Sequence, residues 1–210
     1  MLVKGAIVSE QQETTGDQIV VEREIGAPAA QIFAILADPK LHQATDASGM
    51  VRGTDADAIT AAGQSFDMNM HAEAMGGDYV MTNEVLEFEQ DRRIAWRPAP
   101  KGKPAEGWTW TYALEQLDAG RTRVTLTYDW SAVPEARRAE LGGFPPMSRE
   151  GLEASISKLS ETVEGSQPGG MQSIVAPGAA PGQATTLAGN VAADVASPHE
   201  FRSSTDGRRR

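Results

Sequence analysis

The chain has 210 residues, of which 40% are hydrophobic and 23% charged, a formal net charge of −10 at pH 7, and no cysteine. The length suits one well-cored domain with appendages, and the negative charge disfavours nucleic acid as a partner. The lack of cysteine excludes disulfides, thiolate metal sites and cysteine nucleophiles.

Neither a membrane span nor a secretory signal is expected. No apolar run approaches the roughly 18 residues that a spanning helix needs. The opening MLVKGAIVSEQQ has too short an apolar patch for a signal peptide. We therefore expect a cytoplasmic protein with no integral membrane association.

The first predicted elements are one strand and two short helices. Residues 18–25 (QIVVEREI) alternate as a strand does, and Pro28 suits the first turn of a helix that ends near Ala37. The pair Asp38-Pro39 repeats the helix-start pattern, so we expect a second small helix over about 40–44.

Beyond these helices the hydrophobic period changes to two. Segments 64–74 and 78–88 flank Gly76-Gly77, which favours a hairpin with a two-residue loop. In that register Met68 faces Val85, and one face of the hairpin is apolar and rich in methionine. A further strand is predicted at 92–97, with Ile94 and Trp96 on one face.

The segment GWTWTYALEQL at 107–117 forms the next predicted hairpin with 120–130. A three-residue loop with Gly120 in a left-handed conformation places Trp110 opposite Tyr128 and Tyr112 opposite Leu126. Threonines fall on the other face, so the pattern indicates a sheet with one apolar face.

A helix over 148–164 is predicted last, with Ser148 as its N-cap and an apolar stripe of Leu152, Ile156, Leu159 and Val163. The order of elements indicates an α+β domain. The apolar face of the sheet must be buried against this helix, and any volume that the helix leaves unfilled becomes a pocket.

Three segments carry a resemblance to a known superfamily: IGAPAAQIFAILADPKLHQATDASG, GRTRVTLTYDW and FPPMSREGLEASISKLSETVEG. They resemble the START-like (SRPBCC) superfamily, and within it the bacterial polyketide cyclase/dehydrase and lipid-transport branch. The resemblance implies the helix-grip fold, in which a bent antiparallel sheet wraps around a long C-terminal helix and encloses a cavity for an apolar or amphipathic molecule. The superfamily has no universal catalytic residues, so none is transferred.

The domain organisation follows from this resemblance and from composition. Residues 1–16 are an N-terminal extension, and 17–164 are the START-like ligand-binding domain. Residues 165–193 carry no charge and are rich in glycine, alanine and proline. Such a composition cannot bury enough apolar surface to fold, so we expect 165–210 to be a disordered tail.

The leading functional hypothesis is that a hydrophobic or aromatic small molecule, such as a lipid or a polyketide-like compound, binds between the sheet and the last helix. Phe33 or Leu41 is expected near its entrance. The predicted wall of the site consists of Met68, Met70, Met81, Asn83, Trp96, Trp110, Tyr112 and Tyr128.

Two other classes of function remain open. One is a polyketide cyclase or dehydratase, in which His42 and Asp46 are the candidate proton carriers. The other is a regulatory interaction protein with a protein partner. His71 is expected on the polar face. No metal site is expected, because none of the three histidines lies four residues from another. No cofactor is expected either, and no glycine-rich run matches a phosphate-binding loop.

Overall fold

The structure is a computed structural model that describes residues 16–140 and 145–166. The predicted tail therefore lies almost wholly outside the described residues, as does the N-terminal extension. The described elements are β1 (Gln18–Ile25), α1 (Ala29–Leu36), η1 (Pro39–Leu41), α2 (His42–Thr45), β2 (Val51–Gly53), β3 (Ser65–Ala72), η2 (Glu73–Met75), β4 (Gly77–Glu89), β5 (Arg93–Pro100), β6 (Thr109–Asp118), β7 (Arg121–Asp129), α3 (Glu135–Glu140) and α4 (Arg149–Gly165).

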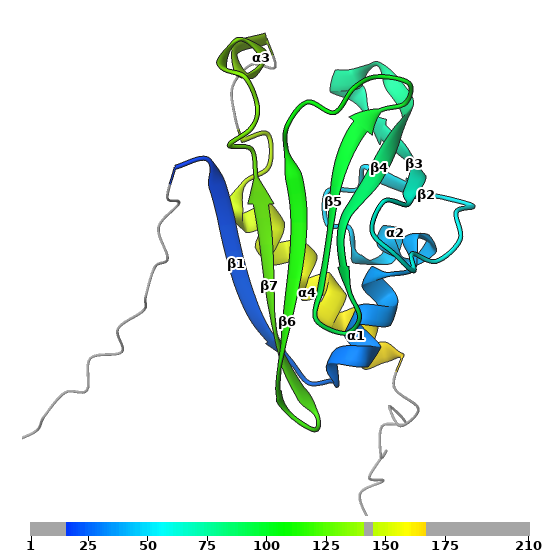
Figure 1. The fold of residues 1–210 in the computed structure, drawn as a ribbon, viewed down its shortest axis with the longest axis vertical. Coiled ribbons are helices and arrows are strands. Elements are labelled where there is room, and N and C mark those ends of the chain that lie inside the picture. Colours follow the sequence, from blue (N-terminus) through cyan, green and yellow to red (C-terminus); the bar gives the residue numbers. More distant parts are fainter. Residues whose placement is uncertain (1–15, 141–144, 167–210) are drawn as a thin grey trace, which may run out of the picture. The chain divides into compact units, whose positions relative to one another are not determined.

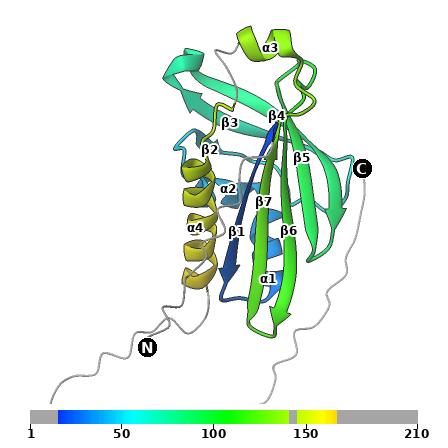
Figure 2. The same ribbon diagram turned by 90° about the vertical axis from the view of Figure 1, so that its left-hand side faces the viewer.

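The described strands form one antiparallel sheet of seven strands in the order β1-β7-β6-β5-β4-β3-β2. Helix α4 lies diagonally across one face of this sheet (Figure 1), and the β3–β4 hairpin curves over toward the side on which α4 lies (Figure 2). This is the bent sheet with a C-terminal helix that was expected, so the α+β helix-grip fold is confirmed.

The helical elements begin where the sequence predicts. The Asp38 carboxylate accepts a hydrogen bond from the backbone N–H of Lys40 at the start of η1, and Ser148 accepts one from the N–H of Gly151 at the start of α4. The N-cap of helix α1 is Pro28, whose side chain has no donor or acceptor. The first N–H group of the helix, that of Ala29, donates to the side chain of Gln116 from β6 at 2.7 Å.

The predicted register of the β3–β4 hairpin is wrong by four residues. Met68 pairs with Met81 rather than with Val85. The reason is that Glu73–Met75 form a 3₁₀ turn that ends in left-handed Gly76, with φ 83°, so the loop has four residues instead of two. An even shift leaves every side chain on its predicted face.

The β6–β7 hairpin has the predicted pairing but not the predicted loop. Trp110 lies opposite Tyr128 and Tyr112 opposite Leu126, as expected. Asp118 pairs directly with Arg121, however, and a bulge before Asp118 restores the register. Gly120 does not take the left-handed φ that a three-residue loop requires.

Besides η2, two described elements have no counterpart among the predictions. Strand β2 has only three residues, too few to show an alternation. Helix α3 has no buried residue and hence no apolar stripe. An ion pair holds this helix instead: Arg138 donates to both carboxylate oxygens of Asp17, at 2.6 and 2.9 Å.

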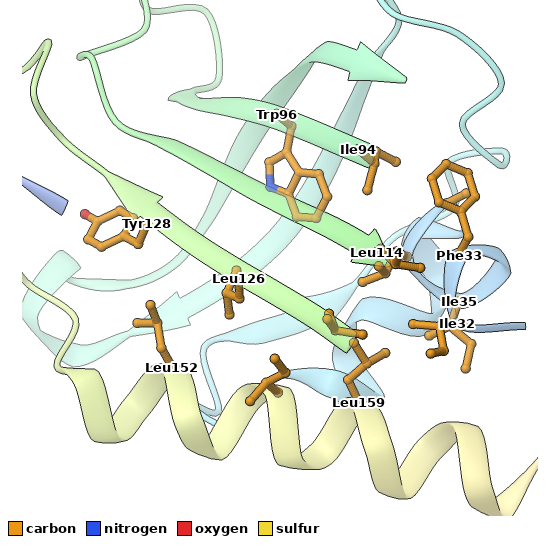
Figure 3. Packing of buried hydrophobic residues seen from close by; sticks show 14 of the residues in the cluster. Ile32, Phe33, Ile35, Ile94, Trp96, Leu114, Leu126, Tyr128, Leu152 and Leu159 are labelled. Atoms are coloured by element: carbon orange, nitrogen blue, oxygen red, sulfur yellow. The ribbon is translucent and has the colours of Figure 1, made fainter. Parts of the chain in front are cut away.

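The hydrophobic core lies between α4 and the face of the sheet that carries Leu126 and Trp96, which we call the inner face. Figure 3 shows Leu152 and Leu159 of α4 directed toward Leu126 and its neighbours on this face. The four predicted stripe residues of α4 are all buried, each at most 2% exposed. Helix α1 closes one end of the core with Ile32 and Leu36.

Candidate ligand-binding site

All eight residues of the predicted wall lie on the inner face. Strand pairing aligns Met68 with Met81 and Trp96 with Trp110, and Tyr128 continues the same row on β7. Met68, Asn83, Trp96 and Tyr128 are at least nine-tenths buried. Met70, Met81, Trp110 and Tyr112 remain partly exposed beside them.

The aromatic rings of this face form two stacks. In the first, Trp96 lies between His42 and Tyr112, with ring centroids 5.3 and 5.7 Å apart and interplanar angles of 22° and 28°. In the second, Trp110 stacks on Tyr128 at 4.3 Å. Both geometries are typical of favourable offset stacking. The partly exposed members, Trp110 and Tyr112, are neighbours in β6 on the same face.

Asn83 is a largely buried residue whose side-chain amide makes no hydrogen bond to any described residue. Its cross-strand neighbours on the inner face are Phe66 and Pro98, which offer no side-chain donor or acceptor. Among the described residues, the one buried side-chain nitrogen or oxygen that lacks both a partner and solvent access is Arg97 Nε. The amide of Asn83, which is only 7% exposed as a residue, therefore still touches accessible space.

His42 lies at the edge of the inner face, and its protonation state follows from its contacts. Its Nε2 lies 2.9 Å from the carbonyl oxygen of Leu36, so this nitrogen carries the proton and donates it. Burial lowers the pKa of His42 below its ordinary value. The ring is therefore neutral at physiological pH, and its Nδ1 has a free lone pair.

Asp46, the predicted partner of His42, is engaged elsewhere. Its Oδ1 accepts hydrogen bonds from the backbone N–H and the hydroxyl of Ser48, and its Oδ2 accepts one from the N–H of Val51. No hydrogen bond joins the side chains of His42 and Asp46 in the described part of the chain. Burial, together with the charge of the Asp46 carboxylate, raises the pKa of Tyr112 in the predicted wall.

The two residues expected near the entrance differ in exposure. Phe33 is 1% exposed and packs edge-on against Phe88, with ring centroids 5.3 Å apart, so it belongs to the core. Leu41 is 38% exposed. Of the two, only Leu41 is available to an arriving molecule.

Phe66 is an inner-face aromatic that the predicted wall omitted. It is 5% exposed and contacts both His42 and Trp96 edge-on, with ring centroids 5.6 and 6.1 Å apart. The available signal was its spacing, since Phe66 precedes Met68 and Met70 by two and four positions in the same strand.

The outer face of the sheet, opposite to the inner face, carries charged and polar side chains. A shallow pocket of about 400 Å³ opens there, and Arg97 pairs with Glu84 at 2.6 Å in its wall. His71 lies near the tip of the β3–β4 hairpin, where its Nδ1 is 2.6 Å from the Asp78 carboxylate. It is thus on the polar side, as expected.

Within residues 16–140 and 145–166, no group of three acidic or histidine side chains could hold a metal ion. Over the same residues, no helix combines the length and the apolar character needed to cross a membrane.

A family model described as "Activator of Hsp90 ATPase homolog 1-like protein" matches residues 26–164. The chain belongs to this family. The match and the fold together confirm the START-like superfamily that the sequence resembles.

The chain also has curated relatives in Mycobacterium tuberculosis. The protein Rv0088 of Mycobacterium tuberculosis is 34% identical over 143 residues, which are 66% of this chain and 60% of that protein. This chain thus spans about 60% of the length of the curated relatives that it matches.

Solved structures share the fold at low identity. The Zhui aromatase/cyclase of Streptomyces sp. R1128 matches with a TM-score of 0.50 and 16% identity over 70% of this chain and 93% of that one. The protein NE0264 of Nitrosomonas europaea matches with a TM-score of 0.52 and 21% identity over 71% of this chain and 95% of that one. At these identities the likeness concerns the fold alone.

Proposed function

We propose that this protein binds a hydrophobic or aromatic small molecule on the inner face of the sheet, beside α4, and that it does so in the cytoplasm. The observation that carries the proposal is the partial exposure of apolar and aromatic side chains that adjoin the core. Trp110, Tyr112 and Met70 pack against buried core residues and still meet solvent. Met81 is likewise partly exposed and lies opposite the buried Met68. A concave apolar surface with few polar groups is the usual form of a small-molecule site.

Two further features support this reading. Methionine side chains adapt their shape to different apolar ligands, and two of the partly exposed residues are methionines. The START-like superfamily also typically binds hydrophobic ligands, and the structural neighbour from Streptomyces sp. R1128 is an aromatase/cyclase by name.

Naphthalene as an aromatic probe and decanol as an aliphatic probe test the proposal. We expect either to shift the backbone and indole NMR signals of Trp96 and Trp110 in the ¹⁵N-labelled protein. Replacing Trp110→Ala should weaken naphthalene binding by about tenfold, since an aromatic pair contributes up to about 1.5 kcal/mol beyond its buried area.

The matched control is Thr111→Ala, one position along β6 on the outer face, which should leave the affinity unchanged. If neither probe shifts an inner-face signal, the proposal fails. Native mass spectrometry of the freshly purified protein would then identify any molecule that remains bound.

A second candidate is a cyclase or dehydratase, because a neutral imidazole lies against the wall. His42 stacks on Trp96, and its free Nδ1 can accept a proton. Turnover of a polyketide-like substrate should then collapse in His42→Gln while ligand affinity survives. Unchanged turnover in that variant would remove His42 as the proton acceptor.

A further inference from the structure

Asn83 is the polar group on the inner face that most needs an external partner. An amide offers two N–H donors and a carbonyl acceptor, and burying it unpaired is unfavourable. Its four nearest positions on the same face are Phe66 and Pro98 across the strands and Met81 and Val85 along β4. All four side chains lack hydrogen-bonding groups apart from the weak acceptor of methionine, so none of these described neighbours satisfies the amide of Asn83.

Tyr112 and Tyr128 add two hydroxyls to this surface. Neither hydroxyl has a hydrogen-bond partner among the described residues, and neither is sealed from solvent access. Burial raises the pKa of both side chains, so both hydroxyls stay protonated and available as donors. The inner face thus combines aromatic rings with several unpaired neutral polar groups.

The described strand positions of this surface offer no free positive charge. Among the inner-face strand positions of the described chain, Arg23 on β1 is the one basic residue, and its guanidinium donates instead to the hydroxyl of Ser157 on α4 at 3.0 Å. The charge that acts on Tyr112 is negative and comes from Asp46, whose carboxylate oxygens are already hydrogen-bonded. The Lys158 ammonium of α4 is also engaged, because it donates to the backbone carbonyl of Asp46 at 2.7 Å. A carboxylate moved here from water would lose its hydration without gaining a counter-ion.

We infer that the ligand of the proposed inner-face site is an uncharged aromatic molecule that carries a hydroxyl or carbonyl group, and that this group pairs with the amide of Asn83. The inference rests on the proposed function and narrows it, because it excludes fatty acids and other carboxylate lipids. It also makes Asn83 the residue that determines specificity, while the aromatic rings supply contact area.

Four probes with the same ring system test whether the site prefers an uncharged hydroxyl group over no polar group or a charged one. They are 2-naphthol, naphthalene, 2-naphthoate and 2-naphthylmethylammonium. Their affinities can be measured at pH 7 from the same tryptophan NMR signals. We expect 2-naphthol to bind several-fold to about tenfold more tightly than naphthalene, which corresponds to one hydrogen bond. Both charged probes should bind at least about tenfold more weakly than 2-naphthol.

Asn83→Leu tests the specific role of the amide, since leucine has a similar volume and removes an unpaired polar group. In this variant the preference for 2-naphthol over naphthalene should disappear, whereas naphthalene itself should bind as well as before or better. The matched control is Asn69→Leu on β3, which is exposed on the outer face and should retain the preference. A merely structural role of Asn83 would weaken all probes alike.

The outcomes distinguish this inference from the proposed function. If naphthalene binds and 2-naphthol binds no better, or if a charged probe binds most tightly, the inference is wrong and the binding function stands. Retention of the 2-naphthol preference in Asn83→Leu also overturns it. If none of the four probes binds, the proposed function fails and the inference fails with it.

Discussion

Gly107, two residues before the aromatic strand β6, is a position that strongly favours glycine. Its φ is 109°, a region that residues with a side chain rarely adopt. A Cβ atom at this position would lie 2.6 Å from the carbonyl carbon of Ala132 and 2.8 Å from the backbone nitrogen of Val133. Both are backbone atoms, so no side-chain rotation can relieve the overlap.

Two other glycines separate the cost of the backbone conformation from the cost of the steric overlap. Gly102 also has a positive φ, 76°, but a Cβ atom there would enter open space, whereas Gly120 has neither constraint. Gly102→Ala should therefore cost about 1–2 kcal/mol for the left-handed conformation alone. Gly107→Ala adds roughly 1–3 kcal/mol for the overlap, and Gly120→Ala should change stability by less than about 0.5 kcal/mol.

Thermal and urea unfolding of the three variants measure these differences. For a domain of this size about 3 kcal/mol lowers the Tm by roughly 6–12 °C. The expected order of stability is Gly120→Ala, then Gly102→Ala, then Gly107→Ala. If Gly107→Ala is no less stable than Gly102→Ala, the close approach of β6 to the segment after β7 is wrong.

Three further changes test other parts of the structure. Burial lowers the pKa of His42 in the folded protein below its ordinary value of 6.5. As the pH falls below about 6.5, His42 therefore binds a proton in the unfolded protein before it does so in the folded protein. The free energy of unfolding should therefore fall as the pH drops below that value, and His42→Gln should flatten this dependence in urea titrations at several pH values. Leu159→Ala on α4, where the side chain is 1% exposed, should lower the free energy of unfolding by about 2–5 kcal/mol in urea, against less than about 0.5 kcal/mol for exposed Glu161→Ala. Ser148→Ala should cost about 1 kcal/mol by the same measurement through the lost N-cap, and Ser148→Asp should not.

Much of the fold could be predicted because its signals are local. The alternation in β6 and β7 assigns Trp110, Tyr112 and Tyr128 to one face whatever the loop between the strands does. The spacing of the apolar residues in α4 likewise identifies its buried stripe. The register of the β3–β4 hairpin was not predictable in the same way, because the 3₁₀ turn at Glu73–Met75 has no hydrophobic pattern that distinguishes it from strand.

For the candidate site, the sequence predicted which residues share a face of the sheet, but not which side chains contact one another. Alternation placed Met68, Met70, Met81 and Asn83 together, and the even register error did not disturb this. The stacking of His42 on Trp96 lay beyond sequence reasoning, since the two residues are far apart in the chain and meet only when η1 and α2 fold against the sheet.

The α+β class, the aromatic inner face and the helix that covers it could all be predicted from the sequence, because they depend on periodicities within single elements. Which polar groups find partners became clear only from the folded chain. Gln116 reaches across to cap α1, Asp46 is held by its own turn, and Asn83 is left facing apolar neighbours. Hydrogen bonding depends on distances between distant segments, and those distances exist only once the chain has folded.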